Sequence, residues 1–140
     1  MKKASKILYL VGAILSILSA LSLVILGVAY IVLGSIGASY NPQDIVDYVV
    51  KEVPDVASWF TVEYVTTFLA TAIATGVVYL IFACFSVASA VFAFKARKDE
   101  LPSRLVAIFN IVFGVLGCGL ANAVAGVFSL VLRAREPQAE

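Results

Sequence analysis

The sequence lacks histidine altogether, contains only two cysteines, and carries charge on 14% of its 140 residues. Without histidine, the chain lacks the side chain that most often serves as a general base and as a neutral metal ligand. Cys84 and Cys118 both lie inside apolar runs, so we interpret them as small buried apolar residues and not as a disulfide pair. The net charge of +1 gives no electrostatic reason to expect nucleic acid as a partner.

Reactive motifs are also missing from the chain. No ionisable side chain interrupts the long apolar runs, although proton relays and most ion-coupled carriers need one there. The sequence has no HExxH metal motif, no phosphate-binding glycine loop in a suitable context and no Ser/His/Asp set. We therefore predict that the protein is not an enzyme and that it binds neither a cofactor nor a metal ion.

Apolar side chains are abundant instead, at 62% of the residues, against roughly 45–50% in soluble domains. A domain of this size exposes too much of its surface to hide so many apolar groups from water. The lipid bilayer is the medium that fits this composition. We therefore predict one integral membrane domain over residues 1–140, of the all-α class.

The first apolar run, residues 7–36, would form a helix about 45 Å long, which exceeds the ~30 Å hydrocarbon core of a bilayer. It is too long for a secretory signal, whose apolar region has about 7–15 residues. Residues 1–6 carry Lys2, Lys3 and Lys6, and basic residues beside a first spanning segment tend to stay in the cytoplasm. We predict a first transmembrane helix in a cell membrane, with a cytoplasmic N-terminus.

Small residues mark the faces by which the helices are predicted to pack, because helices in lipid associate through close backbone approach. On the first run these residues are Gly12, Ser16, Ser19, Gly27 and Gly34. On the second run, residues 62–94, which is uncharged after Glu63, threonine recurs every four positions, at Thr67, Thr71 and Thr75. We interpret this threonine face as the partner of the first helix, and a polar lining for transport is the alternative.

The segment between these runs, residues 37–61, is the only sizeable polar part of the chain. Asn41 can cap a helix and Pro42 suits its first position, so we predict a short amphipathic helix over residues 42–52. Over residues 39–63, Lys51 is the only basic residue, against the carboxylates Asp44, Asp47, Glu52, Asp55 and Glu63. We expect this segment on the outer surface of the membrane, with the aromatic residues that follow the helix at the interface.

The last apolar run, residues 105–132, allows two interpretations. It can form one long helix, so that the chain has three long transmembrane helices, with one face made by Asn110, Gly114, Gly117, Cys118, Ala121, Ala125 and Ser129. Gly114 and Asn122 are the packing candidates of this run. It can also form a short transmembrane hairpin over residues 105–117 and 120–132. The turn would then be Gly117, Cys118 and Gly119, because glycines supply the unusual backbone angles that a turn demands.

The basic residues favour the hairpin. Residues 95–104 form a charged loop with four basic side chains, and Arg133 and Arg135 open the polar tail of residues 133–140. With a hairpin, nine of the ten basic residues lie on the cytoplasmic side. We therefore prefer a polytopic bundle of two long helices and a C-terminal hairpin.

The C-terminal third resembles a family of small bacterial four-pass membrane proteins that carry a domain of unknown function. The similarity lies in the loop KARKDELPSR and in VFGVLGCGLANAVAGVFSLVLRAR, where a glycine-containing break separates two glycine-rich apolar pieces. Asn122 and the pair Ala125 and Gly126, after the break, also match the character of the family. The resemblance implies the hairpin and a bacterial cytoplasmic membrane, and it brings no activity or site residues.

Three functions fit these predictions. We favour a structural or accessory protein that associates with other membrane proteins, or with itself, through its small-residue faces. The first alternative is a small oligomeric transporter or channel whose path is lined by Thr67, Thr71, Thr75, Asn110 and Asn122. The second alternative is an envelope sensor that uses the outer segment.

Overall fold

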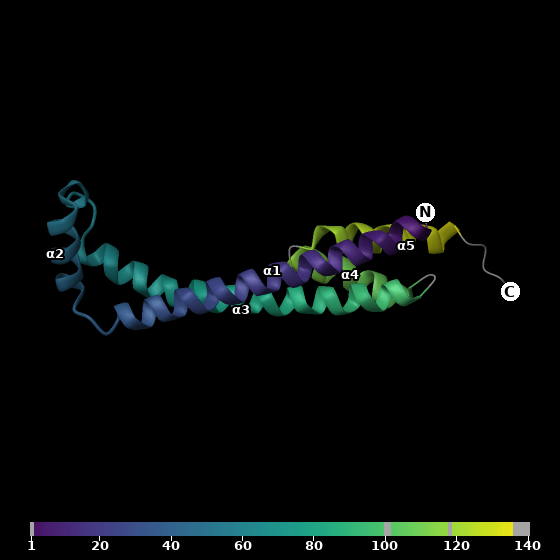
Figure 1. Cartoon of the computed structure of the whole chain (residues 1–140), viewed down its shortest axis with the longest axis horizontal. Coiled ribbons are helices and arrows are strands. Elements are labelled where there is room, and N and C mark those ends of the chain that lie inside the picture. The colour runs from purple at the N-terminus through teal and green to yellow at the C-terminus, as the bar shows by residue number, and fades with distance from the viewer. Residues whose placement is uncertain (1, 100–101, 118, 136–140) are drawn as a thin grey trace. The chain divides into compact units, whose positions relative to one another are not determined.

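The computed structural model describes residues 2–99, 102–117 and 119–135. These residues contain five α-helices and no β-strand: α1 (Lys2–Gly37), α2 (Pro42–Glu52), α3 (Val62–Lys98), α4 (Arg104–Leu116) and α5 (Leu120–Arg135) (Figure 1). A short 3₁₀ helix, η1 (Pro54–Val56), follows α2. The all-α class predicted from the sequence is confirmed.

Two of these helices are long and apolar enough to cross a membrane, over Lys3–Gly37 and Val62–Lys98. Each would be about 50–55 Å long at a rise of about 1.5 Å per residue. Both extend beyond the predicted runs, because α1 begins within the lysine-rich start and α3 continues through Lys95 into the basic segment. Basic side chains suit the last turn of a helix, where the carbonyl ends of the peptide dipoles lie.

The chain divides into two compact units, which we describe separately. The first, here called the hairpin unit, comprises Met1–Leu23 and Ile81–Glu140. The second, here called the α2 unit, comprises Val24–Leu80. Both α1 and α3 therefore contribute one part of their length to each unit.

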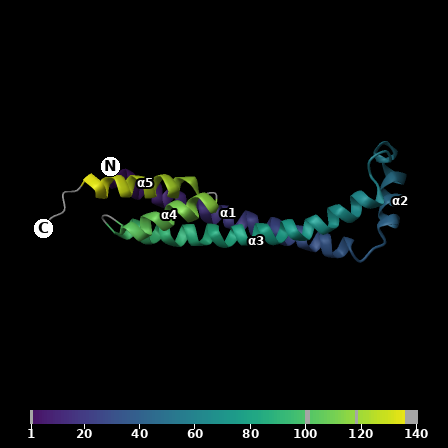
Figure 2. The same cartoon turned by 180° about the vertical axis from the view of Figure 1, so that it is seen from behind.

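In the hairpin unit, α4 and α5 are two separate helices that pack against each other. A Cβ atom added at Gly114 would lie 2.8 Å from the backbone nitrogen of Ala123, and one added at Gly126 would lie 2.7 Å from the carbonyl oxygen of Ala107. Both views show α5 beside the N-terminal part of α1 and α4 beside the C-terminal part of α3 (Figure 1, Figure 2). The alternative of a single helix over residues 105–132 differs from this structure, since α4 ends at Leu116 and α5 begins at Leu120.

A side chain of α3 stabilises the break between α4 and α5 by a hydrogen bond. The Oγ atom of Ser86 donates a hydrogen bond of 2.8 Å to the carbonyl oxygen of Gly117. A Cβ atom at Gly117 would lie 2.8 Å from the backbone of Ser86, so glycine permits this close approach. Cys118, the middle residue of the predicted turn, lies outside the described residues.

In the α2 unit, α2 has the bounds predicted for the amphipathic helix and stands across the ends of α1 and α3 (Figure 1). The side chain of Asn41 accepts a hydrogen bond of 3.1 Å from the backbone N–H of Gln43, which caps the helix. Asp47 accepts a second hydrogen bond, of 2.8 Å, from the Gln43 amide. None of the residues of α2 is buried, so the helix depends strongly on its caps.

Candidate functional site

A buried polar cluster joins three helices of the hairpin unit. Asn122 of α5, Ser16 of α1 and Ser89 of α3 are each 0% exposed, and we call them the amide cluster. The Nδ2 atom of Asn122 donates hydrogen bonds of 2.8 Å to Ser89 Oγ and 3.1 Å to Ser16 Oγ. Ser16 Oγ also donates to Ser89 Oγ at 3.4 Å. The amide cluster therefore fastens the hairpin to both long helices.

Gly12 lets α1 come close to this cluster. A Cβ atom at Gly12 would lie 2.6 Å from the Cγ atom of Asn122 and 2.9 Å from its backbone nitrogen. The Oδ1 atom of Asn122 is buried against Gly12 and accepts no hydrogen bond within the part of the chain that the structure describes. The predicted packing residues Gly12, Ser16 and Asn122 are thus brought into one contact.

A second buried cluster was not predicted. The Tyr9 hydroxyl, on a side chain only 1% exposed, shares a hydrogen bond of 2.9 Å with Ser129 Oγ. Ser5 Oγ lies 3.2 Å from the same atom. A signal was present in the sequence, because Ser5 and Tyr9 precede Gly12 and Ser16 on the same face at helical spacing.

In the α2 unit, the glycines of α1 pack against α3. A Cβ atom at Gly27 would lie 2.9 Å from the carbonyl oxygen of Gly76, and one at Gly76 would lie 2.6 Å from that of Gly27. A Cβ atom at Gly34 would lie 2.6 Å from a side-chain carbon of Ile73. Gly76 was not singled out in the sequence, although a glycine inside a long apolar helix is itself a signal of close packing. Ser19, the remaining predicted residue of α1, belongs to the hairpin unit and is half-buried.

The threonines of α3 lie elsewhere than expected. Thr67 and Thr71 are exposed and Thr75 is half-buried, and the Thr71 hydroxyl donates to the carbonyl oxygen of Thr67 at 2.8 Å. A hydroxyl that donates its hydrogen bond within its own helix needs no partner on a neighbouring helix. The four-residue spacing of the threonines is therefore compatible with a face that points away from α1. Leu69 and Ile73 approach α1 instead, at Gly37 and Gly34.

The residues proposed as a transport lining are divided between the two units. The three threonines belong to the α2 unit, whereas Asn110 and Asn122 belong to the hairpin unit. Asn110 is 0% exposed, and its amide donates to the carbonyl oxygens of Val106 at 2.8 Å and Phe92 at 3.2 Å. Both asparagines therefore make helix-to-helix contacts inside one bundle.

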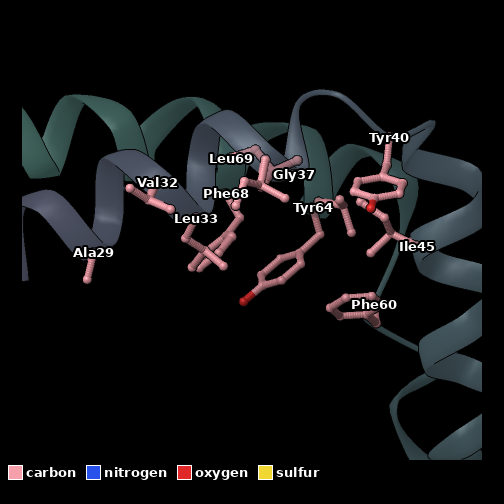
Figure 3. A pocket seen from close by; sticks show the side chains of 12 residues that line it. Ala29, Val32, Leu33, Gly37, Tyr40, Ile45, Phe60, Tyr64, Phe68 and Leu69 are labelled. Atoms are coloured by element: carbon pink, nitrogen blue, oxygen red, sulfur yellow. The ribbon is translucent and has the colours of Figure 1, made fainter.

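The α2 unit contains an apolar groove with a volume of ≈ 680 Å³. Its walls come from the C-terminal part of α1, the N-terminal part of α3, Ile45 of α2 and Phe60 of the linker (Figure 3). Only Tyr40 and Tyr64 bring a polar side-chain atom to the lining. Trp59 stacks edge-on against Tyr64, with ring centroids 5.4 Å apart, and so lies beside the groove.

A smaller hollow of ≈ 350 Å³ adjoins the groove and is lined by Tyr40, Asp44, Ile45 and Tyr48. Tyr40 and Ile45 line both spaces, so the two lie side by side. Asp44 thus places a carboxylate at the edge of an otherwise apolar site. The sequence predicts a membrane-interface position for the aromatic residues of this segment, but it does not predict the groove that they form with α2.

Within the described residues, no three His, Cys, Asp or Glu side chains are grouped so that they could hold a metal ion. Cys84 is exposed on α3, in contrast to its interpretation as a buried residue. No protein-family model matches the chain, and neither the curated proteins nor the solved structures show a detectable similarity to it.

Proposed function

We propose that the chain is a multi-pass accessory protein of the bacterial cytoplasmic membrane, in line with the family that its C-terminal third resembles. The observation that supports this most strongly is the pair of candidate spans, Lys3–Gly37 and Val62–Lys98. Large apolar side chains lie on their outer faces, for example Ile25 at 68% exposure and Val91 at 59%. Such faces are costly in water and suited to lipid. We propose no catalytic role for the chain.

The basic ends of the helices support a cytoplasmic N-terminus. In the hairpin unit, the start of α1 and the ends of α3 and α5 lie at the same end (Figure 1). Lysine and arginine near spanning segments are retained in the cytoplasm, so this end belongs inside the cell. Under this proposal α2 and its acidic neighbours lie on the outer side.

The hairpin would enter the membrane from the cytoplasmic side and return to it. The 13 residues of α4 extend about 20 Å, which is less than the ~30 Å hydrocarbon core. Backbone outside a helix is tolerated at such depth only where protein covers it. The burial of Gly117 and Gly119 and the hydrogen bond from Ser86 meet that requirement.

Association with another membrane helix would use the outer face of α3. The glycine faces of α1 are already occupied within the chain, at Gly12, Gly27 and Gly34. A face of small residues on α3 remains exposed, comprising Thr67, Ala70, Thr71 and Ala74, and we call it the α3 strip. Small side chains allow a second helix to approach closely in lipid, where no hydrophobic force drives association.

Photo-crosslinking in native membranes tests this proposal. A photoreactive amino acid at Ala74, in the α3 strip, should give a discrete adduct with one partner protein or with a second copy of the chain. The matched control is the same amino acid at Ile25, which is 68% exposed on α1 and outside the strip. Diffuse labelling of lipid at both positions, with no protein adduct, would remove the accessory role.

The groove favours a second candidate, a sensor that acts through the outer segment. The groove has an apolar lining, and the adjoining hollow has a carboxylate at its edge, a combination that suits a small amphiphile. Neither helix packing nor contact with lipid requires such a combination. Occupation of the groove would alter the position of α2, because Ile45 belongs to its lining. If the chain is a sensor, deletion of α2 should abolish the cellular response that the sensor triggers. A deletion that changes no phenotype would remove this candidate.

A further inference from the structure

We propose that the groove of the α2 unit binds a cationic amphiphile, with its hydrocarbon chain along the groove and its positive head group beside Asp44. This inference deepens the sensor candidate and is independent of the contact proposed for the α3 strip. It rests on the shape of the groove, on the chemistry of its lining and on the charge around its edge.

The size and lining of the groove fit a hydrocarbon chain. A volume of ≈ 680 Å³ lies within the range of roughly 300–1,000 Å³ that is typical of small-molecule sites. Figure 3 shows that Leu33, Tyr64 and Phe68 face the same open space, and that Ile45 and Phe60 stand at the end nearest α2. The lining offers two tyrosine hydroxyls as its only polar side-chain groups, which suits an alkyl chain better than a peptide backbone.

The charge around the groove selects the head group. Residues 39–63 carry five acidic side chains and one basic side chain, which gives the segment a net charge of −4 (1 − 5). Of these residues, Asp44 lines the hollow that adjoins the groove. An anionic head group would be repelled at this edge and a cationic one attracted, an effect that decreases with added salt.

Two aromatic rings strengthen the preference for a cation. Tyr40 and Tyr48 line the hollow together with Asp44, and both are more than half exposed, at 61% and 68%. The face of an aromatic ring attracts a cation, and recognition of quaternary ammonium groups is a recurrent use of such rings. The carboxylate and the two rings therefore provide the elements of an ammonium site at the mouth of the groove.

Trp59 provides a native reporter for binding, because it is the only tryptophan and its ring contacts those of Tyr64 and Phe60. We would titrate the full chain, in nanodiscs of zwitterionic lipid, with 6-bromododecyl-trimethylammonium and with 6-bromododecanoate, whose bromine lies in the part of the chain near the head group and Trp59. The bromine atom quenches tryptophan at close range. The cationic probe should quench Trp59 saturably, and the anionic probe of equal chain length should bind about tenfold more weakly or not at all.

Three variants separate the site from general membrane partitioning. Asp44→Asn should weaken the cationic probe about threefold to tenfold, whereas Asp55→Asn changes the net charge equally away from the lining and should not. Ala29→Phe places a ring in the groove and should abolish saturable quenching. Circular dichroism and unfolding of each variant establish that its fold is retained.

The outcomes that would overturn the proposal are distinct. Equal affinity for the two probes would refute the charge selection, and equal effects of Asp44→Asn and Asp55→Asn would refute a head-group site at Asp44. Linear quenching that persists in Ala29→Phe would show that the groove is ordinary lipid-facing surface. None of these results bears on the crosslinks at Ala74, so the accessory role and the amphiphile site can fail separately.

Discussion

A single methyl group added at Gly12 should separate α5 from α1 in the hairpin unit. Gly12→Ala would place Cβ 2.6 Å from the Asn122 side chain and 2.9 Å from its backbone. Overpacking of this kind costs about 1–3 kcal/mol. If the amide turns away instead, it loses two hydrogen bonds, each contributing about 0.6–1.7 kcal/mol in a membrane protein. Alanine regains about 1 kcal/mol of helix propensity, so we expect a net loss of about 1 kcal/mol.

The assay is a double-mutant cycle with Asn122→Ala, in which the free energy of unfolding is measured in mixed detergent micelles by circular dichroism. Removing the amide removes the closest obstacle, so the cost of Gly12→Ala should fall by about 1 kcal/mol or more in that background. Ser22→Thr is the matched control, because it adds a methyl group at an exposed position of α1 and can keep the hydrogen bond to Leu18. An equal cost of Gly12→Ala in both backgrounds, or no cost beyond that of Ser22→Thr, would refute the contact.

Two further predictions concern the supports of the turn and of α2. Ser86→Ala removes the hydrogen bond to Gly117, and we expect a loss of about 1–2 kcal/mol in the free energy of unfolding. Ser35→Ala, at an exposed position, is its control, and equal effects would argue against the support. Asn41→Ala removes the cap of α2 and should lower its local stability by about 1 kcal/mol, seen as faster amide hydrogen exchange across α2. Because α2 has no buried residue, the global unfolding midpoint should stay unchanged, and a large shift would contradict the description of α2.

Local signals made α2 and the two long helices predictable from the sequence. Asn41 and Pro42 start α2 by capping and backbone geometry, and these effects depend on neighbouring residues alone. The long helices follow from apolar runs without charge, which leave few other structures available in lipid. The packing of Gly12 and Gly34 could be proposed because small residues at helical spacing permit close approach.

Tertiary contacts decided the features that the sequence left open. A glycine-rich apolar run is compatible with one helix or two, and the interruption at Gly117 is supported from outside the run, by Ser86. The four-residue spacing of Thr67 and Thr71 is the same on a packed face and on an outer face, since the hydroxyl can bond to its own helix. The groove depends on where α2 and Phe60 stand relative to α1 and α3, which no periodicity encodes.

Cysteine labelling from the two sides of the membrane tests the central claim most directly. In a background with Cys84→Ala and Cys118→Ala, the single substitutions Ser58→Cys, Asp99→Cys and Ala134→Cys each report one exposed position. A membrane-impermeant maleimide should label the position at Ser58 in right-side-out vesicles, and those at Asp99 and Ala134 only in inverted vesicles. Labelling of Ala134→Cys together with Ser58→Cys, or of all three from one side, would contradict two long crossings with a hairpin that returns to the cytoplasm.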